Sequence, residues 1–247
     1  MLERLHLIVR VVLLLFAVFV TTAVAETRVD LELVLLADAS RSIDDEEIMF
    51  QREGYAVSIT HPEVLGAIRS GYEQRIAVTY VEWGGVDSQE IVVPWTIING
   101  PSSGRALARK LLKIPRRAFG ANAIGNALSV AHGLIIANDI VGTHKVIDFS
   151  GDSVYSFGGI SILEARAAAV ADGITINGLA ILCHTCPSGR PGFYELETAF
   201  ADLIISGPGS FVITADRRAR FAMAVRRKLV LEIAGSPITV ARVERRK

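Results

Sequence analysis

The sequence predicts an α/β protein with a doubly wound, mostly parallel sheet, one antiparallel edge strand and helices on both faces, a Rossmann-like arrangement. Three observations favour this fold class. Short runs rich in β-branched residues alternate with longer helical segments, a pattern typical of a parallel sheet covered on both faces. A turn-forming segment joins two of the runs and indicates one hairpin. Two predicted strands end in oxygen-bearing side chains, as strands do where a doubly wound sheet binds a ligand.

The strands are expected where short apolar runs meet polar or turn-forming residues. The first run, LELVLLAD, reads as a buried strand, and the turn GGVDS joins the second and third runs into the hairpin. The fourth run ends in the polar sequence SGDS. In chain order, the predicted strands are residues 31–38, 75–83, 89–95, 144–153, 174–182 and 209–215.

The helices are expected where apolar residues recur three and four positions apart or where helix-terminal signals stand. Acidic residues open the first helix, which suits the positive end of the helix dipole. Pro115 closes the second helix, and Gly173 ends the fourth. The predicted helices are residues 44–60, 103–114, 122–138, 159–173, 194–206 and 216–235.

Composition limits both the number of domains and the class of partner. The chain has 247 residues, of which 51% are hydrophobic, enough for one domain with a large core. Its formal net charge is zero, so nothing in the charge favours a nucleic-acid partner. No internal repeat, low-complexity segment or linker divides the chain.

The first 25 residues have the order of a secretory signal peptide. Two arginines precede an apolar stretch at residues 11–20, and the small residues Ala23 and Ala25 follow. An uncleaved membrane anchor is the alternative, but the apolar run is shorter than the ~20 residues that a spanning helix needs. We expect a signal peptide at 1–25, one domain at 26–235 and a short basic tail at 236–247. The mature protein would then have no membrane span and would act in the periplasm or outside the cell.

Both cysteines lie in one short segment, as Cys183-x-x-Cys186. In an oxidising compartment we expect a disulfide between them. Free thiols, a redox pair and a metal site remain alternatives. The pair follows a strand-like run instead of opening a helix, which disfavours the redox role, and it supplies only two of the four ligands of a zinc site.

Three segments carry the polar residues that indicate a function. Asp38-Ala39-Ser40-Arg41-Ser42 follows the first predicted strand, and its i, i+2, i+4 spacing can aim three oxygens at one point. Gly120-Ala121-Asn122 opens a helix that continues to Ala127-Leu128, and Gly151-Asp152-Ser153 follows the fourth strand. Oxygen ligands of which few are charged are typical of a site for a hard cation such as Mg²⁺.

These three segments, in this order, resemble the von Willebrand factor A domain and its metal-ion-dependent adhesion site (MIDAS). The family's D-x-S-x-S is present, its G-x-T-x-x-x-x-A-L has Asn122 in place of threonine, and its T-D-G is replaced by G-D-S around Asp152. The resemblance spans about residues 29–234. Segments near the C-terminus look further like an uncharacterised family of secreted bacterial proteins built on this domain.

The resemblance implies a non-enzymatic binding module with a set of metal ligands. Ser40 and Ser42 would coordinate the ion directly, Asp38 and Asp152 would hold it largely through waters, and Asn122 would offer an amide oxygen. The ion would be Mg²⁺, with Mn²⁺ or Ca²⁺ as alternatives. Neutral first ligands would leave it short of negative charge, so a protein partner would supply an acidic side chain.

Two other readings remain open. Asp38 and the serines can instead cap the next helix, which would leave a metal-free structural scaffold. A serine hydrolase using Ser153 is disfavoured, because only His184 follows that serine and no histidine has an aspartate three residues before it. Asp148 is expected to be a buried structural acid and not a ligand, and the acidic residues 44–47 are expected to form a solvated helix N-terminus.

Overall fold

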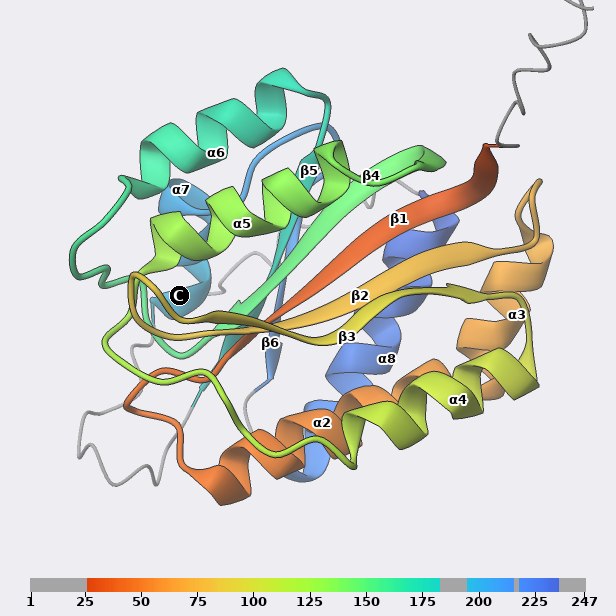
Figure 1. The fold of residues 1–247 in the computed structure, drawn as a ribbon, viewed down its shortest axis with the longest axis horizontal. Coiled ribbons are helices and arrows are strands. Elements are labelled where there is room, and N and C mark those ends of the chain that lie inside the picture. Colours follow the sequence, from red (N-terminus) through yellow and green to blue (C-terminus); the bar gives the residue numbers. More distant parts are fainter. Residues whose placement is uncertain (1–25, 183–194, 216–217, 236–247) are drawn as a thin grey trace, which may run out of the picture.

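The computed structural model describes residues 26–182, 195–215 and 218–235, which form six strands and seven helices (Figure 1). The predicted signal peptide (1–25), Cys183, Cys186 and the basic tail (236–247) lie outside the described residues. Within the described ranges, no helix is long and apolar enough to cross a membrane.

The six strands form one sheet in the order β3-β2-β1-β4-β5-β6. Strand β3 pairs antiparallel with β2 at one edge, and all the other pairs are parallel. The predicted fold class is therefore confirmed, including the antiparallel edge strand. The strands are β1 (Thr27–Asp38), β2 (Ile76–Trp83), β3 (Gln89–Ile98), β4 (Ile140–Gly151), β5 (Thr175–Ile181) and β6 (Val212–Ala215).

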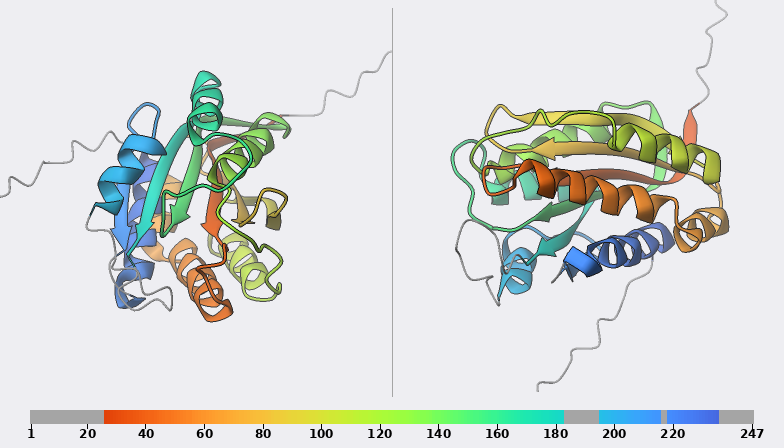
Figure 2. Two further views of the ribbon diagram at one scale, coloured as in Figure 1. Left: turned by 90° about the vertical axis from the view of Figure 1, so that its left-hand side faces the viewer. Right: turned by 90° about the horizontal axis from the view of Figure 1, so that it is seen from below.

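Helices cover both faces of the sheet, as Figures 1 and 2 show. One face carries α2 (Asp45–Ile59), α3 (Pro62–Ser70), α4 (Pro101–Leu111) and α8 (Arg218–Ala234). The other carries α5 (Ile124–Ile136), α6 (Ile162–Ala171) and α7 (Leu196–Leu203). Helix α3, to which the sequence analysis assigned no element, begins with Pro62 at its first turn, a position that proline favours.

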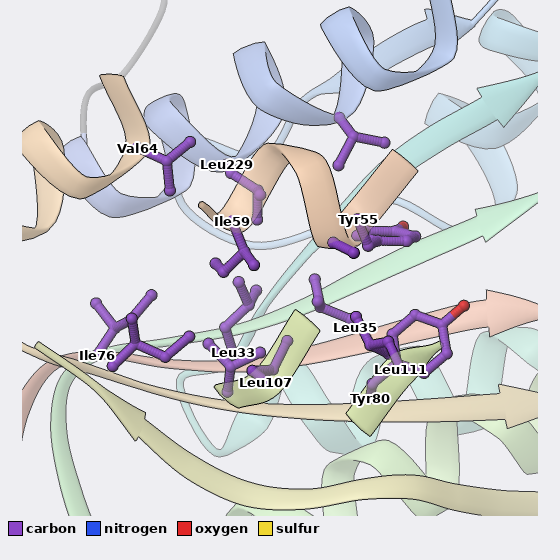
Figure 3. Close-up of a cluster of buried hydrophobic side chains, with 14 of the residues drawn as sticks. Leu33, Leu35, Tyr55, Ile59, Val64, Ile76, Tyr80, Leu107, Leu111 and Leu229 are labelled. Carbon is purple, nitrogen blue, oxygen red and sulfur yellow. The ribbon is translucent and has the colours of Figure 1, made fainter. Parts of the chain in front are cut away.

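The core consists of two apolar layers, one on each side of the sheet. Successive residues of β1 point alternately into them, because side chains alternate along a strand. Leu33 and Leu35 pack toward α2, α4 and α8 (Figure 3), and Val34 and Leu36 pack toward α5. Every residue of β2 is buried, which explains why the central strands read as continuous apolar runs.

The edge strand β3 contains an irregularity at Pro94. Val78 pairs with Thr96 and Tyr80 with Val93, so two residues of β3, Pro94 and Trp95, lie opposite Thr79 alone. This is a β-bulge, and proline, which has no N–H to donate, is confined to such positions in a sheet. The hydroxyl of Thr79 donates to the Val93 carbonyl at 2.8 Å and holds the bulged segment to β2.

A buried charged cluster joins α8 to the sheet. Lys228 Nζ lies 2.8 Å from Asp148 Oδ1 on β4 and also donates to Glu232, one turn further along α8. Asn177 on β5 donates to the same Glu232 carboxylate at 3.0 Å. The prediction that Asp148 is a buried structural acid is confirmed, and its partner is a lysine that the sequence analysis did not identify.

The sheet order brings the ends of β1 and β4 together. From β1 the chain builds β2 and β3 on one side and then returns to place β4 on the other, so the strand order reverses between β1 and β4. Ligands bind at such a reversal, beyond the carboxyl ends of the strands. The loops after β1 and β4, the β2–β3 turn and the loop before α5 gather there, at the left-hand end of Figure 1.

Candidate metal centre

The loop after β1 turns back on the carboxylate of Asp38. Asp38 is fully buried, and its Oδ1 accepts the backbone N–H of Ser40 at 2.8 Å. The hydroxyl oxygens of Ser40 and Ser42 lie 3.2 Å apart. Gln51 of α2 donates to the Asp38 carbonyl at 3.0 Å and fixes the end of the strand. The loop therefore places one carboxylate and two hydroxyls together, as the i, i+2, i+4 spacing predicts.

The acidic residues that follow this loop form a helix terminus, as expected. The Asp44 side chain accepts the Glu47 N–H at 2.8 Å, and the Glu47 side chain accepts the Asp44 N–H at 3.0 Å. This reciprocal arrangement is a capping box. Since Asp44 caps α2, the serines of the preceding loop are not needed for that purpose.

Arg116, in the loop between α4 and α5, holds the loop after β1 in place through backbone carbonyl groups. Its guanidinium donates to the carbonyls of Ala39 at 2.6 Å, Ser40 at 3.2 Å and Ile43 at 2.8 Å. It also donates to the carbonyl of Ala118 in its own loop at 3.0 Å. The sequence analysis did not identify Arg116, because it donates to backbone carbonyls, which every residue has and which form no pattern in the sequence.

Asn122 is held to two neighbouring loops through its own segment of backbone. The Arg41 N–H donates to Gly120 O at 2.9 Å, so the loop that carries Asn122 lies against the loop that carries the serines. The Asn122 carbonyl accepts the N–H of Phe157, in the loop after β4. The structure thus places Asn122 between the two acidic segments, with its residue partly buried.

Asp152 follows β4 and lies close enough to Asp38 for the two carboxylates to interact. Burial, followed by the negative charge of Asp152, raises the pKa of Asp38 from 3.8 to about 7. The backbone amides of Ser40 and Asp152 act in the opposite direction and favour the ionised form. Two acids facing each other in a buried position are the arrangement that a cation stabilises.

The local packing also fits a bound cation. Asp38 Oδ2 is buried and accepts no hydrogen bond from the described residues. The nearby backbone amide of Asp152 only lowers the pKa of the carboxyl group. A Cβ on Gly151 would lie 3.3 Å from this oxygen, so glycine there lets β4 approach the carboxylate closely. A buried acceptor without a partner is costly, and a metal ion or a metal-bound water would satisfy it.

The donor set selects the kind of ion. Within the described part of the chain, no group of three or more His, Cys, Asp or Glu side chains could hold a metal. Any ion here would therefore depend on two carboxylates supplemented by hydroxyl and amide oxygens. Such hard, mostly neutral ligands suit Mg²⁺, Mn²⁺ or Ca²⁺.

The geometry around Ser153 gives no support to a hydrolase. Ser153 Oγ accepts the N–H of Tyr155 at 3.1 Å. Of the histidines in the described residues, His132 pairs with Asp172 at 2.7 Å and His61 with Arg226 at 2.8 Å. No histidine contact to Ser153 is present in the described ranges.

Solved structures with the same fold include adhesive and matrix proteins. The pilus adhesin SpaC of Lactobacillus rhamnosus GG matches 85% of this chain with a TM-score of 0.59 and 13% identity. Proximal thread matrix protein 1 of the mussel byssus, with a zinc-occupied MIDAS motif, matches 85% with a TM-score of 0.59 and 16% identity. This chain spans 31% of the first protein and 49% of the second.

A third solved structure is similar in length as well as in fold. The vWF domain of the pilus tip protein Mfa5 from Porphyromonas gingivalis matches 81% of this chain, which covers 94% of that domain, with a TM-score of 0.54 and 10% identity. The fold is therefore that of a von Willebrand factor A-like domain. No curated protein sequence matches this chain. Residues 28–237 match the family described as "Protein of unknown function (DUF1194)", and the chain belongs to that family.

Proposed function

We propose that this chain is a non-enzymatic binding module that holds a protein partner through a divalent ion. The ion would lie at the rim formed by the loops after β1, before α5 and after β4. The observation that carries the proposal is the buried carboxylate of Asp38, which faces Asp152 beside the paired hydroxyls of Ser40 and Ser42. Asp38 forms no ion pair with a cationic side chain of the described residues.

The residues divide into direct and water-mediated ligands. Ser40 and Ser42 would bind the ion directly, Asn122 would offer its amide oxygen, and Asp38 and Asp152 would hold bound waters. Mg²⁺ is the expected ion, because it prefers oxygen ligands and retains water. When bound, it would supply a Lewis-acidic position open to a carboxylate oxygen of the partner.

A binding role is supported by what the structural neighbours are. One is a pilus adhesin and another is a matrix protein with a zinc-occupied MIDAS motif. Action in the periplasm or outside the cell rests on the predicted signal peptide. Mass spectrometry of the protein secreted by its native host should show a chain that begins at Glu26, and a stable membrane-bound species retaining residues 11–20 would contradict this.

Calorimetric titration of the protein with Mg²⁺, Mn²⁺ and Ca²⁺ tests the metal site directly. We expect saturable heat with at least one ion, and Asp152→Asn should abolish it. Asp139→Asn is the matched control, because Asp139 is exposed and precedes β4, at the opposite end of that strand from Asp152. Asn122→Thr should tighten binding or leave it unchanged.

The same preparation separates the alternatives. An absence of heat with all three ions would favour the metal-free scaffold. Hydrolysis of a generic ester that is lost in Ser153→Ala would favour the hydrolase. Retention of a captured partner in excess chelator would show that the partner binds by surface contacts alone.

A further inference from the structure

Four large apolar side chains are exposed around the candidate metal centre. Val86 is 38% exposed, Phe119 55%, Tyr155 48% and Phe157 58%. They come from three different loops: the β2–β3 turn, the loop before α5 and the loop after β4. Single exposed apolar residues are common on protein surfaces, but a group around one site marks an interaction surface. We call these four residues, three of them aromatic and one aliphatic, the aromatic rim.

Backbone contacts tie the aromatic rim to the loops of the metal centre. The Gly85 N–H, beside Val86, donates to Phe119 O at 2.8 Å, and the Phe157 N–H donates to Asn122 O. Tyr155 is held through its N–H to Ser153, next to Asp152. The left-hand panel of Figure 2 looks onto the end of the molecule where these loops gather.

Close packing fixes the loops that carry the rim. A Cβ on Gly84 would lie 2.4 Å from Phe119 O, so only glycine allows the β2–β3 turn to approach this closely. The Phe119 N–H donates to Ser88 Oγ at 2.9 Å, and the Arg116 guanidinium lies 4.6 Å from the Phe119 ring centroid. The rim is therefore presented by ordered backbone, which lowers the entropic cost of binding.

Two exposed arginines lie in the loops beside the rim, and one exposed acid, Asp87, follows Val86 in the β2–β3 turn. Arg41 stands between the two metal-site serines, and Arg117 stands beside Arg116; both are exposed. Neither side chain has a hydrogen bond or ion pair with any residue in the described part of the chain. Together with a divalent ion, these arginines favour a partner that is anionic.

We propose that the partner is a protein segment in which an aspartate or glutamate is flanked by aromatic or large aliphatic side chains. This inference rests on the proposed function: the acid would occupy the open metal position. The flanking side chains would pack on the aromatic rim, and further acidic groups of the segment would meet Arg41 and Arg117. Buried aromatic and arginine contacts of this kind carry most of the affinity of protein interfaces.

A peptide array tests the inference with a defined probe. Synthetic nonapeptides would carry a central glutamate flanked either by Phe and Leu or by Ser and Gly, and labelled protein would be applied in Mg²⁺. We expect the apolar-flanked peptides to bind about 10-fold more tightly, since burying one large side chain contributes roughly that much. Chelator should release both sets.

Variants separate this inference from the proposed function. Phe157→Ser and Val86→Ser should remove the preference for apolar flanks while the calorimetric Mg²⁺ affinity stays unchanged. Tyr72→Ser is the matched control, because Tyr72 is 93% exposed and follows α3 at the opposite end of the molecule, and it should leave the preference intact.

The outcomes point in different directions. If Mg²⁺ binds but both peptide sets bind equally, or neither binds, the inference is wrong and the metal site stands. If Mg²⁺ itself does not bind, the proposed function fails. If the protein instead binds anionic phospholipid vesicles through Phe157, the rim is a membrane-contact surface and the inference of a peptide partner is overturned.

Discussion

Replacing Asp38 with asparagine should stabilise the protein in the absence of metal and remove its response to metal. The substitution keeps the shape of the side chain and an oxygen that can accept the Ser40 N–H. It removes the buried negative charge that faces Asp152. A residue that binds an ion is expected to cost stability when the ion is absent, which is the usual conflict between function and stability at binding sites.

The magnitude follows from the pKa of Asp38. Burial and the charge of Asp152 raise the pKa from 3.8 in an unfolded chain to about 7 in the folded protein, a difference worth about 4 kcal/mol. Since the folded-state pKa is raised, the stability contributed by the protonated carboxyl is fully present below pH 3.8 and is lost as the pH rises to about 7. The gain from Asp38→Asn should therefore be small near pH 4 and reach ~2–4 kcal/mol at pH 8, the lower value applying if the amide N–H groups lack acceptors.

Urea unfolding in chelator at pH 5 and pH 8 measures this gain, and repeating the pH 8 measurement in excess Mg²⁺ should remove most or all of the difference between the two proteins. An ion present at ~100 times its Kd stabilises the wild-type protein by about 2.7 kcal/mol, and the variant should gain nothing. Asp30→Asn is the control at the other end of β1. Asp30 accepts the backbone N–H of Glu73 at 2.9 Å, so the Asp30→Asn protein should be less stable than wild type. It should still be stabilised by Mg²⁺ as much as wild type is.

The reasoning would be refuted by an Asp38→Asn protein that is less stable than wild type in chelator at pH 8. Such a result would mean that the carboxylate is well compensated inside the folded chain without any metal. A gain that does not depend on pH would likewise show that charge is not its source.

Three further outcomes are expected. Arg116→Met should lower the free energy of unfolding by ~2–4 kcal/mol, because it leaves buried carbonyls without donors and removes a cation–π contact. The same substitution should weaken Mg²⁺ binding in calorimetry. Arg117→Met, the control, should change neither the urea unfolding nor the Mg²⁺ affinity. Lys228→Met should cost ~3–5 kcal/mol by leaving two buried acids unpaired, and more at pH 8 than at pH 5, because burial raises the pKa of both acids. Replacing Cys183 and Cys186 with serine should lower the melting temperature in scanning calorimetry only modestly, since a disulfide would close a very short loop; loss of folding would contradict this.

The centre of the sheet could be predicted because strands β1 and β2 are buried on both faces. The apolar runs of β1 and β2 record that burial directly, and the turn between β2 and β3 sets their antiparallel pairing. The start of β4 could not be predicted. The first residues of β4 are partly exposed and include Gly142. They form a strand only because they pair with the start of β1. The Glu32 carboxylate adds a contact by accepting the Gly142 N–H at 2.8 Å.

Helix α3 and the role of Arg116 could not be predicted, because neither leaves a clear pattern in the sequence. Helix α3 has nine residues, and only Val64, Leu65 and Ile68 are buried, too few to show a clear period. Four of the five metal-ligand candidates lie at or just after the ends of β1 or β4, and Asn122 precedes α5, so their place at this end of the sheet could be predicted. The role of Arg116 depends on carbonyl groups up to 77 residues away, a contact that only the folded chain creates.

The bulge at Pro94 also limits how copies of this protein can meet. An open edge strand offers a row of hydrogen-bonding groups that can recruit the sheet of another molecule. In β3 that row is interrupted, because Pro94 has no N–H and the strand is distorted beside it. At the other edge, β6 has only four residues. Both edges of the sheet are therefore poor templates for pairing with the sheet of another copy of this protein.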